Sequence, residues 1–169
     1  MICIEGTSFA LLIVSDLYLR GRGTGMPVSG PPSLRWGSLN FALLLLSIAP
    51  NALAKRAAEH FDLNAVRRWM VVCVALGVAF LGIRGLEFAS LNVSWHHNAY
   101  GSVLWTLLGF HTVHLLTDFV DTAVLAVVMF TGPLKPSRFV DVSENAMYWY
   151  FVVAAWIPIY LTIYWTPLG

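Results

Sequence analysis

The chain has 169 residues, of which 58% are hydrophobic and 11% are charged, and its formal net charge at pH 7 is +1. Soluble domains average about 25% charged residues, so this composition excludes an ordinary soluble protein and predicts an integral membrane protein. The near-neutral chain offers no basic patch or arginine-rich tail for phosphate groups, so a nucleic-acid partner is not expected. The expected partners are the lipid bilayer and other membrane proteins.

The sequence predicts five helices. A membrane-spanning helix needs about 20 apolar residues, and polar or Pro/Gly-rich segments mark the boundaries between helices. We expect them at about 2–19, 34–53, 69–91, 100–130 and 144–165. Residues 1–19 are short for a spanning helix, but they lack the basic start and the cleavage site of a signal peptide and are kept in the fold. No repeat at the period of a solenoid or a transporter is present. The sequence thus predicts an all-α, polytopic transmembrane helix bundle that forms one domain over residues 1–169.

The distribution of lysine and arginine predicts the orientation in the membrane, because cytoplasmic loops carry more of these residues. Aromatic residues at the end of the last helix, Tyr160, Tyr164 and Trp165, are typical of a membrane interface. The bias in basic residues places the N-terminus in the cytoplasm and the C-terminus outside. One side of the predicted bundle receives Lys55, Arg56, Arg67, Arg68, Lys135 and Arg138, and the other receives Arg20, Arg22 and Arg35.

The stretch GFHTVHLLTDFVDTAVLAVVMF, residues 109–130, places four ionisable side chains in an apolar run. At about 100° per residue they fall within an arc of about 80° on one helix. A charged side chain at the centre of a bilayer costs about 3 kcal/mol, so this stripe is expected to face protein or a cavity rather than lipid. Hydrogen bonding between helices and a role in proton movement are both open interpretations. The stripe consists of His111, His114, Asp118 and Asp121.

Four more ionisable residues lie in or at the edge of the predicted helices: Glu5, Arg84, Glu87 and Glu144. Arg84 and Glu87 are three residues apart, a spacing that lets two side chains meet on one helix surface. We interpret them as a structural salt bridge that fixes helix packing, with a functional role as the alternative.

Catalytic, haem and metal sites are not expected in this chain. A bis-histidine haem needs one ligand from each of two facing helices, and His111 and His114 are the only histidines inside the predicted spans. His60, His96 and His97 fall in connectors, and the His96-His97 pair is interpreted as interfacial rather than metal-binding. No nucleophile with a neighbouring base and no phosphate-binding loop is visible. The sequence therefore predicts no catalytic, cofactor-binding or metal residues.

Four sequence blocks together resemble a known family. They are IEGTSFALLIVSDLYLR, LGIRGLEFASL with Glu87, YGSVLWTLLGFHTVH with His111 and His114, and ENAMYWYFVVAAWIPIYLTIYW from residue 144 to 165. In order and spacing they resemble subunit III of the haem-copper oxidases, the cytochrome c and quinol oxidase family, in its five-helix form. The resemblance implies that Glu5 corresponds to the carbodiimide-reactive glutamate of that family.

The chain also departs from the family pattern. The first two of the usual seven family helices have no counterpart here. The family sequence Trp-His-Phe-Val-Asp is replaced by WYFVV at 149–153, and Asp118 stands where the family usually has a small residue. We hypothesise that the polar function moved from the fifth helix to the fourth. Asp118→Asn should then destabilise the bundle or its docking, and an unchanged yield of the complex would count against the hypothesis.

The resemblance implies an accessory, non-redox subunit III of a proton-pumping terminal oxidase, which reduces oxygen to water in aerobic respiration. It implies packing against the catalytic subunit I and other respiratory subunits, and it assigns haem and copper to the catalytic partner. The implied roles are to stabilise that partner and to support proton uptake, with Glu5 on the cytoplasmic side. The resemblance implies no cofactor in this chain; the family holds phospholipid in a cleft beside its first two helices, which have no counterpart here, so bound phospholipid is the one open alternative.

Two other functions stay open at this point. The accessory subunit of a nitric oxide reductase belongs to the same broad family, and a small proton-coupled transporter would use the buried acids as coupling sites. Alternating-access transporters are commonly built from repeats, and these five helices contain none. This favours the oxidase subunit over the transporter. The implied location is the bacterial plasma membrane, with the mitochondrial inner membrane as the alternative.

Overall fold

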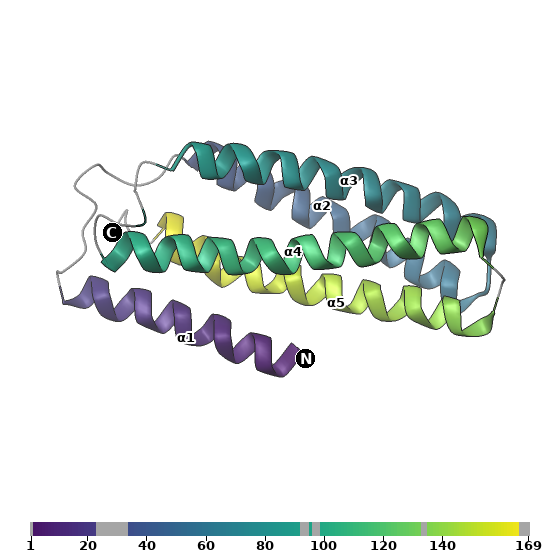
Figure 1. The fold of residues 1–169 in the computed structure, drawn as a ribbon, viewed down its shortest axis with the longest axis horizontal. Coiled ribbons are helices and arrows are strands. Elements are labelled where there is room, and N and C mark those ends of the chain that lie inside the picture. The colour runs from purple at the N-terminus through teal and green to yellow at the C-terminus, as the bar shows by residue number, and fades with distance from the viewer. Residues whose placement is uncertain (1, 23–33, 92–94, 96–98, 133–134, 166–169) are drawn as a thin grey trace. The chain divides into compact units, whose positions relative to one another are not determined.

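The structure is a computed structural model that describes residues 2–22, 34–91, 95, 99–132 and 135–165. Figure 1 follows the described helices in chain order from α1 to α5. No strand occurs among the described residues, and the predicted all-α fold is confirmed. The elements are α1 (Ile2–Gly21), α2 (Leu34–Glu59), α3 (Leu63–Ala89), α4 (Ala99–Thr131), α5 (Pro136–Tyr160) and the π-helical segment η1 (Leu161–Trp165).

Two helices begin earlier than the sequence predicted. Helix α3 begins at Leu63 rather than near 69, and α5 begins at Pro136 rather than near 144. The prediction counted apolar residues alone, whereas these helices extend into polar sequence that carries its own start signals. The Asp62 carboxylate accepts a hydrogen bond from the Ala65 backbone N–H at 3.1 Å and caps α3. Proline is favoured in the first turn of a helix because its missing N–H would be unpaired there in any case.

The turn between α2 and α3 is a tight C-terminal cap. Phe61 adopts a left-handed backbone conformation with φ of 55°. The Asp62 N–H donates to the Ala57 carbonyl at 2.9 Å and the Phe61 N–H donates to the Ala58 carbonyl at 3.0 Å, the bond pattern of a Schellman motif. This position usually takes glycine, and here the Phe61 ring packs edge-on against Phe139 at 5.1 Å between centroids.

Four helical segments are long and apolar enough to cross a membrane: Arg35–Glu59, Leu63–Ala89, Gly101–Thr131 and Pro136–Trp165. Helix α1, which the sequence marked as short for a span, is not among the candidates found in the described residues. Four such segments in one chain are the pattern of a multi-pass membrane protein.

The chain divides into two compact units. The first unit comprises Met1–Phe41, Ile83–Val113 and Ala154–Gly169, and the second comprises Ala42–Gly82 and His114–Val153. The boundaries fall within α2, α3, α4 and α5. The expectation of a single domain stays a prediction.

The core of the second unit has a cluster of buried apolar residues and, elsewhere, contacts of aromatic residues. Trp149 stacks on Phe80 at 5.5 Å and donates its indole N–H to the Ser47 hydroxyl at 2.9 Å. A Cβ at Gly77 would overlap the Phe119 ring, so glycine allows this close approach. The cluster of buried apolar residues consists of Ala57, Ala58, Val66, Met70, Ala126, Met129, Phe139 and Val142.

Candidate functional site

The centre of the first unit is a buried ion pair on α3. Arg84 Nη1 lies 2.7 Å from Glu87 Oε2, and the two side chains are 2% and 1% exposed. The spacing of three residues places both side chains on one face of the helix, as the sequence predicted. Burying two charges is costly, and the cost is offset only when further hydrogen bonds satisfy the remaining polar atoms. The partners of each charge therefore decide what the pair contributes.

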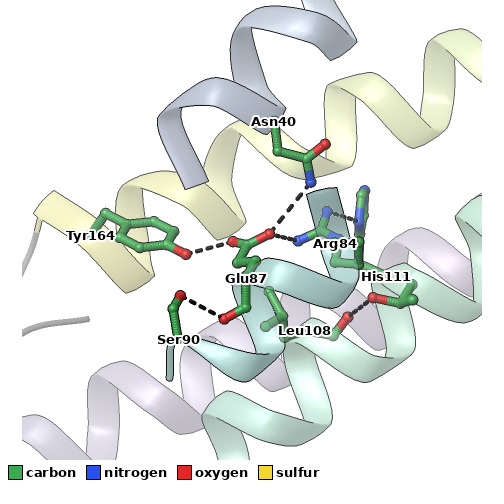
Figure 2. Close-up of polar contacts among 8 residues, drawn as sticks. Asn40, Arg84, Glu87, Ser90, Leu108, His111 and Tyr164 are labelled. Carbon is green, nitrogen blue, oxygen red and sulfur yellow. Dashed lines mark hydrogen bonds and ion pairs between the residues drawn. The ribbon is translucent and has the colours of Figure 1, made fainter. Parts of the chain in front are cut away.

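Glu87 is held by donors from two other elements. The Tyr164 hydroxyl of η1 donates to Glu87 Oε1 at 2.5 Å, and the Asn40 amide of α2 donates to Oε2 at 3.4 Å. Figure 2 shows Tyr164 and Arg84 on opposite sides of the carboxylate, with the Asn40 amide pointing at the same oxygen as Arg84. Gly37 makes room for Tyr164, because a Cβ at that position would overlap the phenol ring. Three donors thus surround one carboxylate that has almost no contact with solvent.

Arg84 is held by aromatic side chains. Its Nη2 lies 3.2 Å from His111 Nδ1 on α4, and its guanidinium lies 4.1 Å from the centre of the Trp156 ring on α5. A guanidinium can only donate, so His111 Nδ1 accepts this hydrogen bond. The His111 ring also packs on Trp156 at 4.8 Å and on Phe9 of α1 at 6.1 Å between centroids. The network therefore joins α1, α2, α3, α4, α5 and η1 within the first unit.

Some polar atoms around this network lack partners. Arg84 Nε, Asn40 Oδ1 and Trp156 Nε1 are buried and have no hydrogen-bond partner among the described residues. An unpaired buried polar atom costs about 1–3 kcal/mol. The network is therefore only partly satisfied, and its stability depends on the charges that remain paired.

The predicted stripe on α4 is buried at three of its four positions. His111 and Asp118 are 0% and 1% exposed, and His114 is 8% exposed. Asp121 is exposed, as is Glu144 on α5, and Glu5 on α1 is partly exposed. The structure brings Arg84, Glu87 and His111 together, while His114, Asp118, Asp121 and Glu144 belong to the second unit. The predicted connector residues His96 and His97 lie outside the described residues.

Asp118 lines a small cavity inside the second unit. Its Oδ1 is buried and has no hydrogen-bond partner among the described residues. The cavity has a volume of ≈ 10 Å³, and its polar lining includes Ser47, Asn51 and Thr122. Holding one water takes about 10–15 Å³ and several polar partners, so this space is close to the size of a single water.

Asp121 and Glu144 line an open groove of ≈ 370 Å³ with Asp141 in the second unit. Beside it, the Asn145 amide of α5 donates to the Thr122 hydroxyl of α4 at 2.8 Å. This is a direct polar link between two helices that both qualify as membrane spans.

Thr122→Val is expected to lower the free energy of unfolding by about 0.6 kcal/mol, the average for a hydrogen bond between membrane helices. Valine keeps the shape of threonine but removes the acceptor of the Asn145 amide. The matched control is Thr131→Val on the same helix, because the exposed Thr131 hydroxyl donates to the Val127 carbonyl of its own helix. Unfolding in one detergent, followed by tryptophan fluorescence, compares the two variants, and equal effects would show that the link contributes nothing.

Sequence reasoning missed several partners in the network. Asn40 interrupts the apolar run LNFALLLL, which is the signal that could have marked it as buried and bonded. Tyr164 was interpreted as an interfacial aromatic residue, yet it is 1% exposed and bonded to Glu87. Asp16 of α1, which is 2% exposed, was also missed. The described residues contain no group of three or more His, Cys, Asp or Glu side chains positioned to hold a metal ion.

These features define a class: a multi-pass helical membrane protein whose first unit encloses a buried Arg–Glu–His network. The family model for cytochrome c oxidase subunit III matches residues 24–167. This match covers most of the chain and confirms the resemblance seen in the sequence. The chain belongs to the cytochrome c oxidase subunit III family.

Individual relatives agree with the family match. The chain is 30% identical over 111 residues to cytochrome c oxidase subunit 3 of Corynebacterium diphtheriae, covering 64% of this chain and 54% of that protein. It is 29% identical over 126 residues to a probable cytochrome c oxidase subunit 3 of Nocardia farcinica, covering 73% and 62%. The chain is 24% identical over 164 residues to cytochrome c oxidase subunit 3 of Thermostichus vulcanus, covering 95% of this chain and 81% of that protein. The chain thus spans less than two thirds of the length of the first two relatives.

Proposed function

We propose that this chain is an accessory, non-redox subunit III of a proton-pumping terminal oxidase in aerobic respiration. The family match over residues 24–167 carries the proposal. The chain packs against the catalytic subunit I and other respiratory subunits, and haem and copper belong to the catalytic partner.

The buried network supports a scaffolding role for the chain. Arg84 and Glu87 bond each other on α3, and both also bond side chains of other elements of the first unit, with His111 among them; none of the three is exposed. A side chain that moves protons between water and a partner needs access that these residues lack. We therefore assign this part of the predicted site to packing, so that the bundle presents a rigid face to the catalytic subunit.

Support of proton uptake is assigned to residues outside that network. Glu5 lies on α1 and is partly exposed, and in the proposed orientation the N-terminus is cytoplasmic and the C-terminus is outside. Asp121 and Glu144, with their open groove, are the exposed acids of the predicted set. The proposed location is the bacterial plasma membrane, with the mitochondrial inner membrane as the alternative.

Purification of the tagged chain from mildly solubilised membranes tests this function. We expect haem and copper in fixed proportion to the chain, measured by the reduced-minus-oxidised optical spectrum and by metal analysis. The same purification from cells with the untagged chain controls for carry-over. Haem with non-haem iron and no copper would assign the chain to a nitric oxide reductase instead. A colourless, stable preparation would contradict the subunit assignment and favour a transporter, which liposome flux of the chain alone would then detect.

A further inference from the structure

The turn between α2 and α3 exposes an aromatic side chain at a position that usually takes glycine. Phe61 has a φ of 55°, in the left-handed region, where the Cβ atom crowds the following carbonyl oxygen. A bulky residue in this region is an outlier that the surrounding structure must hold in place. Glycine would adopt the same conformation without strain. Phe61 therefore occupies this position at a conformational cost.

The chain itself covers only part of the Phe61 ring. One edge contact joins the ring to Phe139, at 5.1 Å between centroids, and Phe61 is still 61% exposed. Phe139, the inner member of the pair, is 8% exposed and belongs to the cluster of buried apolar residues. The contact with Phe139 uses one edge of the ring. Most of the apolar surface of Phe61 is therefore available to another molecule.

The neighbours of Phe61 place its ring outside the hydrocarbon layer of the membrane. Glu59, His60 and Asp62 are all exposed, and two candidate membrane spans meet at this turn. Charged side chains avoid the hydrocarbon, so the turn lies in the polar layer beside it. The aromatic residues favoured in that layer are Trp and Tyr, whose rings carry a polar group that phenylalanine lacks. A protein surface is therefore a better cover for this ring than the bilayer is.

The turn holds the ring in one place. The Phe61 N–H donates to the Ala58 carbonyl at 3.0 Å, and the Asp62 N–H donates to the Ala57 carbonyl at 2.9 Å. On the other side, the Asp62 carboxylate caps α3 at the Ala65 N–H. A rigid support lowers the entropy lost on binding, and an aromatic side chain has only two rotatable bonds. Phenylalanine is also enriched in the cores of protein interfaces.

We propose that Phe61 is an anchor that inserts into an apolar pocket of a neighbouring protein in the complex. The exposed acids on either side of the ring, Glu59 and Asp62, fit a pocket whose rim carries lysine or arginine. The proposal rests on the accessory-subunit function proposed above, and in the orientation proposed there the pocket lies on the cytoplasmic side of the membrane.

Subunit exchange between purified complexes tests this anchor. The complex that carries the tagged chain is mixed with an excess of untagged, isotope-labelled complex, and the tagged chain is recovered at intervals. The labelled fraction of the subunits recovered with it, measured by mass spectrometry, gives the rate at which the chain dissociates. Phe61→Gly is expected to raise this rate about 30-fold, the effect of losing an interface hot spot.

Three further variants separate the anchor from the fold. Phe61→Asn tolerates the left-handed conformation and should dissociate as fast as Phe61→Gly. Asp62→Asn keeps the cap of α3 and removes one exposed charge; its dissociation rate should stay near that of the wild type, because rim charges act mainly on association. Phe139→Leu weakens the packing beneath the ring but keeps Phe61, and its rate should also stay near that of the wild type.

A wild-type dissociation rate in Phe61→Gly or Phe61→Asn would overturn the proposal. Equal acceleration in Asp62→Asn or Phe139→Leu would also overturn it, because the turn or its packing would then matter rather than the anchor. A haem–copper complex with an unchanged rate would contradict only the anchor. Faster exchange in a complex without copper would support the anchor and contradict the oxidase assignment. A tagged chain that recovers no other subunit would contradict both.

Discussion

Arg84→Leu is expected to lower the free energy of unfolding by about 3–5 kcal/mol, the range for removing one partner of a buried ion pair. Glu87 would remain 1% exposed in the first unit without its compensating cation. The substitution also removes the donor to His111 Nδ1 and the contact with the Trp156 ring. Chemical unfolding in a single detergent, performed on the chain with its accompanying subunits, measures the change.

The double variant Arg84→Leu/Glu87→Gln separates a charge effect from a packing effect. Glutamine keeps an acceptor for Tyr164 and Asn40 but carries no charge, so the buried site becomes neutral. The double variant is therefore expected to lose less stability than Arg84→Leu alone, because coupled groups are not additive. A loss equal to the sum of the two single variants would show that the pair is not coupled.

Lys55→Leu provides the control at an exposed ion pair. Lys55 and Glu59 are 3.8 Å apart, and their side chains are 26% and 52% exposed. Such pairs contribute at most about 1 kcal/mol, because water screens the charges and the long side chains lose entropy. A loss as large as that of Arg84→Leu would mean that burial does not determine the effect.

Helical periodicity accounts for much of what the sequence predicted about α4. Taking His111 as the reference direction, Asp118 lies about 20° away, His114 about 60° and Asp121 about 80° on the same side. The exposed fractions rise in that order, from 0% and 1% to 8%, and Asp121 is exposed. The centre of the stripe is therefore buried and its edge lies outside the buried face, because a sequence pattern does not define how wide that face is.

The partners of the buried charges were beyond sequence reasoning. The spacing within α3 predicted that Arg84 and Glu87 meet, because that contact is local. Asn40 and Tyr164 lie 47 and 77 residues from Glu87 along the chain, so their contacts depend on how the helices pack. The helix starts were missed for a different reason. Asp62 and Pro136 are local signals, but a count of apolar residues does not register them.

Asp118→Leu is expected to raise the free energy of unfolding by about 1–3 kcal/mol, because it removes a buried polar atom that lacks a partner. Asp118 Oδ1 has no hydrogen-bond partner among the described residues, and leucine keeps the branching of aspartate with methyl groups in place of the two oxygens. The hypothesis drawn from the sequence, in which Asp118 holds the bundle or its docking together, predicts the opposite sign. The unfolding measurement and the yield of the purified complex decide between them.

Asp118→Asn sharpens this comparison, because it keeps a polar side chain of the same size at the cavity of ≈ 10 Å³. If Asp118 is an unpaired acid, asparagine should change stability less than leucine, since one polar atom still lacks a partner. If both variants lower the stability and the yield of the complex, Asp118 has a partner in the assembled protein, either a water in the cavity or a group of another subunit. If Asp118→Leu is more stable than the natural protein, then the natural protein retains Asp118 at a cost in stability. Residues at functional sites often have such a cost, so this result would indicate a function for Asp118.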